Sequence, residues 1–229
     1  ELDETEKKLV KLTINNFSLA ISNFILNKEI NESQREMIFK LGDVIETRFR
    51  DNHNHIYRVS KISSILAEAY GFSKEEIDLI TLTATLHDIG KISIPDEILL
   101  KPGKLTFEEF EEMKKHSING YNMINVNNKS SVFSVAGEIA LHHHEKWNGL
   151  GYPDKLKGEE ISKFSRIVSV ADVFDALAHK RAYKDAWSIE EIKAFMLEEK
   201  GESFQPLIVD LLLENMEKIL KILEEYPSY

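Results

Sequence analysis

The sequence contains no cysteine. This absence excludes disulfide bonds, thiolate metal sites and cysteine nucleophiles, so any metal ion must be held by imidazole and carboxylate groups. Both groups are available, with 8 histidines and 39 aspartates and glutamates among 229 residues. That length allows one substantial domain with its own core, or one domain plus a helical extension.

The chain also lacks an excess of positive charge, since its formal net charge is -10. Nucleic-acid binding relies on clustered lysine and arginine that neutralise phosphates, so this charge argues against general nucleic-acid binding. A small phosphate ligand is not excluded, because bound metal cations can reverse the sign of the potential locally.

Long apolar runs and the features of a secretion signal are missing as well. No run approaches the roughly 20 apolar residues that cross a bilayer, and the start lacks the basic and apolar regions of a signal peptide. We therefore predict a cytoplasmic protein with no membrane contact from this segment. Because the chain begins at Glu1 and not at Met, we expect it to be part of a longer protein.

No segment shows the sustained alternation and hairpin turns that mark strands, so we predict an all-α fold. Apolar spacing predicts a first helix over residues 2–26, a break at 27–31, and a second helix that opens with a capping box formed by Ser33 and Glu36. Three more capping pairs and one proline mark later helix starts: Ser73 with Glu76, Thr106 with Glu109, Ser188 with Glu191, and Pro206.

Two of these later helices bear on the interpretation of the chain. The helix that starts at Ser73 is predicted to run to His87 and Asp88, a rigid place for metal ligands. The last helix is predicted to run from Pro206 to about residue 226.

Several histidines and carboxylates stand near the ends of predicted helices, where they could together bind metal ions. The candidates are Asp51, His55, His87, Asp88, His116, His143, His144 and Asp172. Asp51 and His55 are one helical turn apart, and a carboxylate such as Asp88 can bridge two ions. The number of candidates exceeds the ligands of one zinc and favours two or more ions, of iron or manganese more readily than magnesium.

Each histidine taken alone is more simply explained as a hydrogen-bonded structural residue. Order and spacing reverse that interpretation, because His55, His87-Asp88 and Asp172 resemble the HD superfamily of metal-dependent phosphohydrolases. The Gly151-Tyr152-Pro153 loop, which follows His143-His144-Glu145 and precedes Asp172-Val173-Phe174-Asp175, is similar to the HD-GYP subgroup. The resemblance covers residues 51–206.

The resemblance implies a bacterial phosphodiesterase that hydrolyses cyclic di-GMP, behind an upstream sensory or receiver domain. It divides the chain into an N-terminal helical region, residues 1–48, and an HD-GYP catalytic domain, residues 49–229. The first region is a connector or the remnant of a regulatory domain, and a dimerising role for it stays open. It also implies seven metal ligands: His55, His87, Asp88, His116, His143, His144 and Asp172.

The remaining site assignments also follow from the resemblance. Lys91, Arg181 and Lys184 match cations that contact phosphate, although Arg181 and Lys184 also fit a solvated basic patch. Tyr152 and Pro153 would shape the substrate pocket, with Tyr152 or Trp147 as a stacking face for guanine. The resemblance also implies Asp88 and Lys91 as the catalytic groups.

Two positions depart from the subgroup. Trinuclear members carry Glu one turn before the first ligand histidine, where this chain has Asp51, so we expect two divalent ions and leave a third open. His142 stands where Tyr is common and is interpreted as a packing residue or a partner of its neighbours.

Four further residues have supporting or bystander interpretations. Asp175 and Glu145 are interpreted as outer partners of the ligands. His53 and His179 are interpreted as solvated or packing residues.

The predicted reaction opens cyclic di-GMP to pGpG by in-line attack of a hydroxide held between two ions, and further cleavage to GMP stays open. Two alternatives stay open. One is a metal-containing module that binds a cyclic dinucleotide and signals without turnover. The other is a different HD-superfamily enzyme, such as a nucleotidase or a guanosine tetraphosphate hydrolase, which would be expected to lack the Gly-Tyr-Pro loop.

Overall fold

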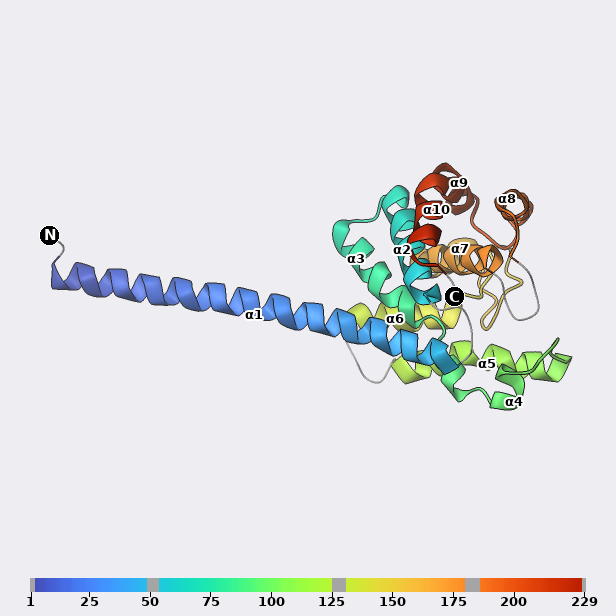
Figure 1. Cartoon of the computed structure of the whole chain (residues 1–229), viewed down its shortest axis with the longest axis horizontal. Coiled ribbons are helices and arrows are strands. Elements are labelled where there is room, and N and C mark those ends of the chain that lie inside the picture. Colours follow the sequence, from blue (N-terminus) through green and yellow to red (C-terminus); the bar gives the residue numbers. More distant parts are fainter. Residues whose placement is uncertain (1–2, 49–53, 125–130, 180–185, 228–229) are drawn as a thin grey trace. The chain divides into compact units, whose positions relative to one another are not determined.

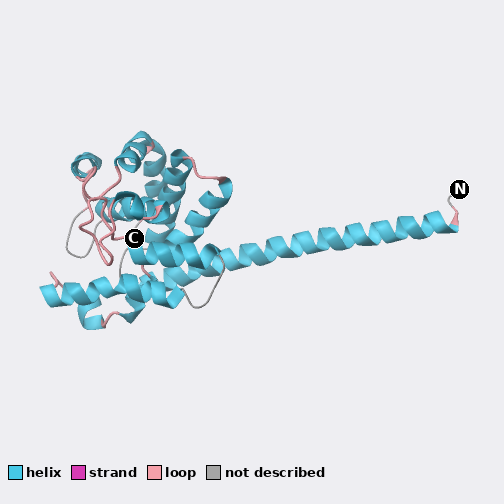
Figure 2. Cartoon of the chain, turned by 180° about the vertical axis from the view of Figure 1, so that it is seen from behind, coloured by secondary structure: helices cyan, strands magenta, loops and turns pink. Residues whose placement is uncertain are grey.

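A computed structural model describes residues 3–48, 54–124, 131–179 and 186–227. The predicted all-α class is confirmed, because helices joined by loops make up these residues and none of them forms a strand (Figure 2). The chain divides into two compact units, Glu1–Ile38 and Phe39–Tyr229. All residues of the candidate site belong to the second unit.

The first helix, α1 (Glu4–Arg48), is continuous over 45 residues. The predicted break at 27–31 and the capping box at Ser33 are therefore wrong. The chain has no glycine or proline before Gly42, and asparagine in a helix costs only a fraction of a kcal/mol relative to alanine. An ion pair one turn apart, Lys28 Nζ to Glu32 Oε1 at 3.7 Å, spans the segment where the break was expected.

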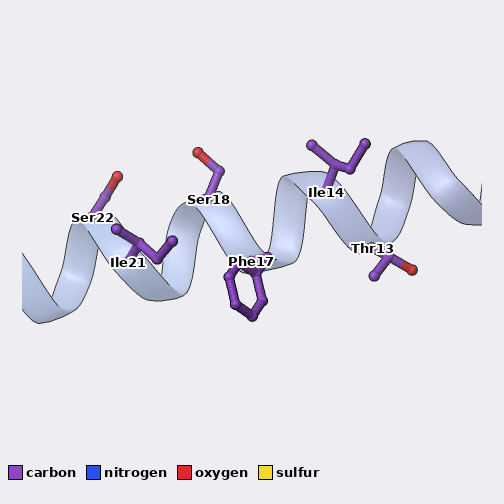
Figure 3. Close-up of a pocket in the computed structure, with 6 residues that line it drawn as sticks. All are labelled: Thr13, Ile14, Phe17, Ser18, Ile21 and Ser22. Atoms are coloured by element: carbon purple, nitrogen blue, oxygen red, sulfur yellow. The ribbon is translucent and has the colours of Figure 1, made fainter.

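Every residue of α1 from 4 to 37 is exposed. Figure 3 shows Ile14, Phe17 and Ile21 projecting from this helix beside small hydroxyl side chains. One 18-residue window of α1 has a mean hydropathy of 1.3, which makes the helix long and apolar enough to cross a membrane by length and composition alone. This measure corrects the expectation that the chain holds no segment of that kind.

The second unit contains the other helices of the described chain (Figure 1). They are α2 (His55–Tyr70), α3 (Lys74–Thr83), α4 (Asp96–Leu99), α5 (Phe107–Ile124), α6 (Ser131–His142), α7 (Lys163–Ala178), α8 (Ile189–Glu198), α9 (Pro206–Glu214) and α10 (Met216–Glu225), with short 3-10 turns η1 (Ala84–Leu86), η2 (Ile89–Ser93) and η3 (Gly158–Glu160).

Helix α2 forms the centre of this unit, since it packs against α3, α7, α9 and α10. Its apolar face, with Ile62 and Leu66 fully buried, meets Val170 and Phe174 of α7 in one hydrophobic core. Burial of such side chains stabilises a fold by roughly 1.5–3 kcal/mol each. The same packing fixes α2 and α7, which carry the candidate ligands His55 and Asp172.

Local capping signals set several helix boundaries as predicted. Ser73 and Ser188 form reciprocal capping boxes at the starts of α3 and α8, and Thr106 does the same with Glu109 before α5. Gly71 ends α2 with a φ of 93°, a left-handed conformation that glycine adopts without steric cost.

Two predicted helices differ in extent. The α-helical part of α3 ends at Thr83 and continues as η1, so His87 and Asp88 lie in the turn between two 3-10 segments. Asp88 has φ -101° and ψ 10°, outside the helical region, so the helix does not continue through it. The last predicted helix is divided at Asn215, whose side chain donates to the Leu211 carbonyl.

Candidate metal centre

The structure brings seven predicted ligands together from five segments. His55 opens α2, His87 and Asp88 lie between η1 and η2, His116 lies in α5, His143 and His144 follow α6, and Asp172 lies in α7. The donor atoms of six of them, all but Asp172, form two overlapping groups, and within each group the atoms lie within 4.8 Å of one another. One group is Asp88, His116, His143 and His144, and the other is His55, His87 and Asp88.

Asp88 belongs to both groups, and its two oxygens face different histidines. Oδ2 lies 3.4 Å from Nε2 of His87, whereas Oδ1 lies 3.4 Å from Nε2 of His116 and 3.8 Å from Nε2 of His143. At the far end, Asp172 Oδ1 lies 3.4 Å from Nε2 of His55. A carboxylate between two sets of nitrogen donors is the arrangement that bridges two ions.

Four of the histidines direct Nε2 towards this centre because Nδ1 is engaged elsewhere. Nδ1 of His87 donates to the Ala84 carbonyl at 2.8 Å, His116 to Met113 at 2.8 Å, and His143 to Ile139 at 3.0 Å. Nδ1 of His55 lies 2.7 Å from Asp175 Oδ2. A carbonyl only accepts, so Nδ1 carries the proton and Nε2 presents its lone pair, as in metal-bound histidine.

Several of the inward-facing atoms are buried without a hydrogen-bond partner. They are Nε2 of His87, His116 and His143, and Oδ1 of Asp88. A buried polar atom without a partner costs about 1–3 kcal/mol, and here such atoms gather at one point. The donor set of imidazole nitrogens and carboxylate oxygens fits divalent iron or manganese.

Burial sets the protonation of the histidines nearest α5 and α6. Burial lowers the pKa of His116 and, more strongly, that of His143, and it lowers the pKa of His144 to about 3. These rings are neutral at pH 7 and therefore ready to bind a cation. Burial opposes the charge of Asp88 too, but Lys91 and His87 hold the pKa of its carboxyl well below the usual range.

His55 is held by a buried pair that the sequence interpretation did not identify in full. Arg58, one turn after His55 on α2, is fully buried and donates from Nε to Asp175 Oδ1 at 2.6 Å and from Nη2 to Oδ2 at 3.0 Å. Asp175 thus contacts a candidate ligand, and its role as an outer partner of the metal centre stays a prediction. His179, interpreted as a bystander, also donates to the backbone carbonyl of Asp175 from Nδ1, at 3.0 Å.

We expect Asp175→Asn to weaken metal binding about 10- to 100-fold, the usual effect of removing an outer-shell partner. The amide of asparagine has one neutral acceptor oxygen, so it cannot replace the two charged oxygens that hold Arg58 and the His55 ring together. Calorimetric titration with manganese(II) measures the change. Asp96→Asn is the matched control, because Asp96 is an exposed partner of Arg48; an Asp175→Asn affinity equal to that control would contradict the role.

The turn that carries His87 and Asp88 is locked against α5 by a glycine. A Cβ placed on Gly90 would lie 1.9 Å from the His116 carbonyl oxygen and 2.4 Å from the Gly120 nitrogen. Only glycine allows this approach of η2 to α5. The contact fixes the distance between Asp88 and His116.

The Gly151-Tyr152-Pro153 loop lies against the same cluster. The Tyr152 ring centroid is 4.8 Å from that of His144, and Lys114 Nζ lies 5.5 Å from the Tyr152 ring. A Cβ on Gly151 would lie 2.4 Å from the Glu145 Cα, so the loop needs glycine there to pack this closely. Glu145 was predicted to partner the histidines, but its Oε1 instead accepts from the Asp154 and Lys155 amides and thereby holds the loop.

Other predicted residues fall elsewhere. Trp147 packs under the Arg166 guanidinium, 5.5 Å from the ring, and His142 contacts Asp154 at 2.9 Å, away from the other histidines. Four residues of the earlier interpretation lie outside the described residues: Asp51, His53, Arg181 and Lys184.

Glu46 was missed altogether. It is a buried carboxylate whose Oε1 lies 3.7 Å from His55 Nε2. The only sequence signal is an acidic residue among apolar neighbours in the predicted helix before His55.

Comparison with known proteins gives concordant results. A family model described as HD domain matches residues 29–208. The chain is 40% identical over 228 residues to a 3'3'-cGAMP-specific phosphodiesterase 2 of Vibrio cholerae, covering all of this chain and 44% of that protein. It is 41% identical over 200 residues to the cyclic di-GMP phosphodiesterase response regulator RpfG of Xanthomonas campestris, covering 87% and 53%.

A solved structure shares the fold. A cyclic GMP-AMP specific phosphodiesterase of V. cholerae (V-cGAP3) superposes with a TM-score of 0.60 at 18% identity, over 85% of this chain and 55% of that one. The chain thus spans about half the length of the curated relatives it matches.

Proposed function

This chain belongs to the HD-domain family, in its HD-GYP group, and from that premise we propose that it is a metal-dependent phosphodiesterase of cyclic dinucleotides. One observation carries the proposal. Buried Nε2 atoms of His87, His116 and His143 and Oδ1 of Asp88 converge without hydrogen-bond partners. Two groups of metal-binding side chains that share one carboxylate suit hydrolysis with two ions, whereas a module that only binds the dinucleotide does not require the second group.

The chemistry divides between the ions and the protein. Divalent ions, when bound, lower the pKa of a water and withdraw charge from the phosphate oxygens of the substrate. Asp88 belongs to both groups of donor atoms and would contribute a carboxylate oxygen to each of two ions. Lys91, whose Nζ lies 2.5 Å from Asp88 Oδ2, keeps that carboxylate charged and lies within reach of a phosphate beside it.

The substrate surface extends from the ligands in two directions. Tyr152 covers His144, and its ring offers a face for a base. A cavity of about 370 Å³ is lined in part by His143 and His144, together with the apolar residues Val173, Phe195 and Phe204. Its volume lies within the range of small-molecule pockets. Arg181 and Lys184 remain our candidates for the second phosphate.

Cyclic di-GMP is our first choice of substrate, with opening to pGpG and further cleavage to GMP. The named activity of the V. cholerae relative makes 3'3'-cGAMP the second candidate. The two differ by one base, and both present the same pair of phosphodiester groups to the ligands. A nucleotidase or guanosine tetraphosphate hydrolase is less well supported, because Tyr152 and its loop lie against the cluster.

Removal of metal tests the proposal directly. We expect protein treated with a chelator to lose hydrolysis of both cyclic dinucleotides, and iron(II) or manganese(II) under reducing conditions to restore it. Chromatography of the products distinguishes pGpG from GMP and ranks the two substrates. Binding of cyclic dinucleotide with no product in any metal would show a binding module and refute the enzyme.

A further inference from the structure

Glu46 is a buried acid at the edge of the metal centre that none of the assignments above includes. It lies near the end of α1, in the same compact unit as the ligands, and is 7% exposed. Its two oxygens have different environments. Oε2 accepts a hydrogen bond from the backbone amide of Ile56 at 3.4 Å, whereas Oε1 faces His55 Nε2 at 3.7 Å.

The packing that places Glu46 is tight. One turn earlier on α1, a Cβ on Gly42 would lie 2.8 Å from the Thr85 carbonyl oxygen, so the helix approaches η1 as closely as a glycine allows. The neighbouring Ile45 is 6% exposed. The position of the Glu46 carboxylate is therefore fixed by the fold and is not a chance surface rotamer.

His55 Nε2 faces two carboxylates, Glu46 and Asp172, the second at 3.4 Å. Its other nitrogen already donates to Asp175. Both distances exceed an ordinary N–H···O hydrogen bond of about 2.7–3.2 Å. They match the separation of ligands across one cation, since two donors about 2.1 Å from an ion lie roughly 3.0–3.7 Å apart at ordinary coordination angles.

The charges point the same way. Arg58 pairs with Asp175, and Lys91 pairs with Asp88. Within the described part of the chain, the ion pairs of Glu46 and Asp172 are made to histidine alone. Burying two carboxylates against one imidazole is costly unless a positive charge lies between them.

We propose that Glu46 is a metal ligand, which with His55 and Asp172 completes the coordination of an ion at the His55 end of the centre. The inference rests on the metal dependence proposed above. It assigns to Glu46, nine residues before His55, the carboxylate role that the sequence suggested for Asp51. The ligand set then draws on α1 as a sixth segment.

Glu46→Gln separates this role from a structural one. The amide oxygen of glutamine can still accept from Ile56 N, but a neutral amide is a poor ligand for iron or manganese. We expect manganese(II) titration, followed by calorimetry and by elemental analysis of gel-filtered protein, to show at least about a tenfold weaker site, or the loss of one ion per chain. Asp43→Asn, one turn earlier on α1 and half-buried, removes the same charge as a control and should bind as the wild type does.

The outcomes are distinguishable. Wild-type binding with an unchanged Glu46→Gln isotherm would overturn the role of Glu46 and leave the phosphodiesterase proposal intact. A wild-type protein that takes up neither manganese nor iron would instead overturn the proposed function. If Glu46→Gln is unfolded in chelator, Glu46→Asp replaces it, because it keeps the charge but is one methylene shorter; wild-type affinity in that variant would contradict a ligand whose reach is fixed by Gly42.

Discussion

Alanine in place of Asp88 should abolish metal occupancy and hydrolysis together. Asp88 contacts ligands of both groups, so its loss leaves the histidines without the carboxylate that joins them. We expect turnover to fall at least about a thousandfold, well beyond the 10- to 100-fold effect of an outer-shell residue. The Lys91 ammonium also loses its ion pair with Asp88, and the site becomes less negative where a cation should bind.

Metal content and product formation are measured on the same preparation. Asp210→Asn is the matched control. Asp210 lies in α9, outside the segments that carry candidate ligands, and forms an ion pair with Lys200. Turnover that survives in Asp88→Ala while the control is normal would show that Asp88 does not join the two groups. Loss of metal in both variants would point instead to a general loss of fold.

Among substitutions of a glycine by alanine near the candidate metal centre, we expect Gly90→Ala to lower the stability of the protein most. The new Cβ would overlap backbone atoms of α5 at 1.9 Å and 2.4 Å, and backbone cannot rotate away as a side chain can. Overpacking costs typically about 1–3 kcal/mol, and a clash with backbone atoms places this variant at the upper end, about 3 kcal/mol. For a chain of this size that corresponds to a fall in Tm of roughly 6–12 °C.

The displacement of α5 has a second consequence, because His116 lies on it. We expect Gly90→Ala to bind manganese less tightly even at temperatures where it stays folded. Gly71→Ala is the comparison: its Cβ meets no atom within 4 Å, and only its φ of 93° opposes alanine, at a cost of about 1–2 kcal/mol. Thermal melting in chelator compares the two, and equal losses would contradict the steric account of Gly90.

Features that depend on neighbours in sequence were predictable. Capping boxes at Ser73 and Ser188, the glycine that ends α2 and the all-α class follow from local rules, and the structure has them. The candidate ligands could also be picked out from the sequence, because His87-Asp88 and His143-His144 stand as adjacent pairs in it. The failed break at 27–31 came from treating asparagine as a helix breaker, although its cost is small beside that of proline or glycine.

Features that depend on distant segments were not predictable. Arg58 and Asp175 are 117 residues apart, and nothing local distinguishes their buried pair from two surface charges. Glu46 reaches the centre because Gly42 lets α1 approach Thr85, a contact between segments about 40 residues apart. Glu145 holds the Gly-Tyr-Pro loop through backbone amides, a role that its position beside two histidines does not indicate.

The number of metal ions per chain tests the central claim most directly. The protein is reconstituted anaerobically with manganese(II) or iron(II), gel-filtered and analysed for metal and protein. Two groups of donors that share Asp88 predict at least about two ions per chain. A content well below one ion per chain in both metals, from protein that is folded, would contradict a metal centre at these residues.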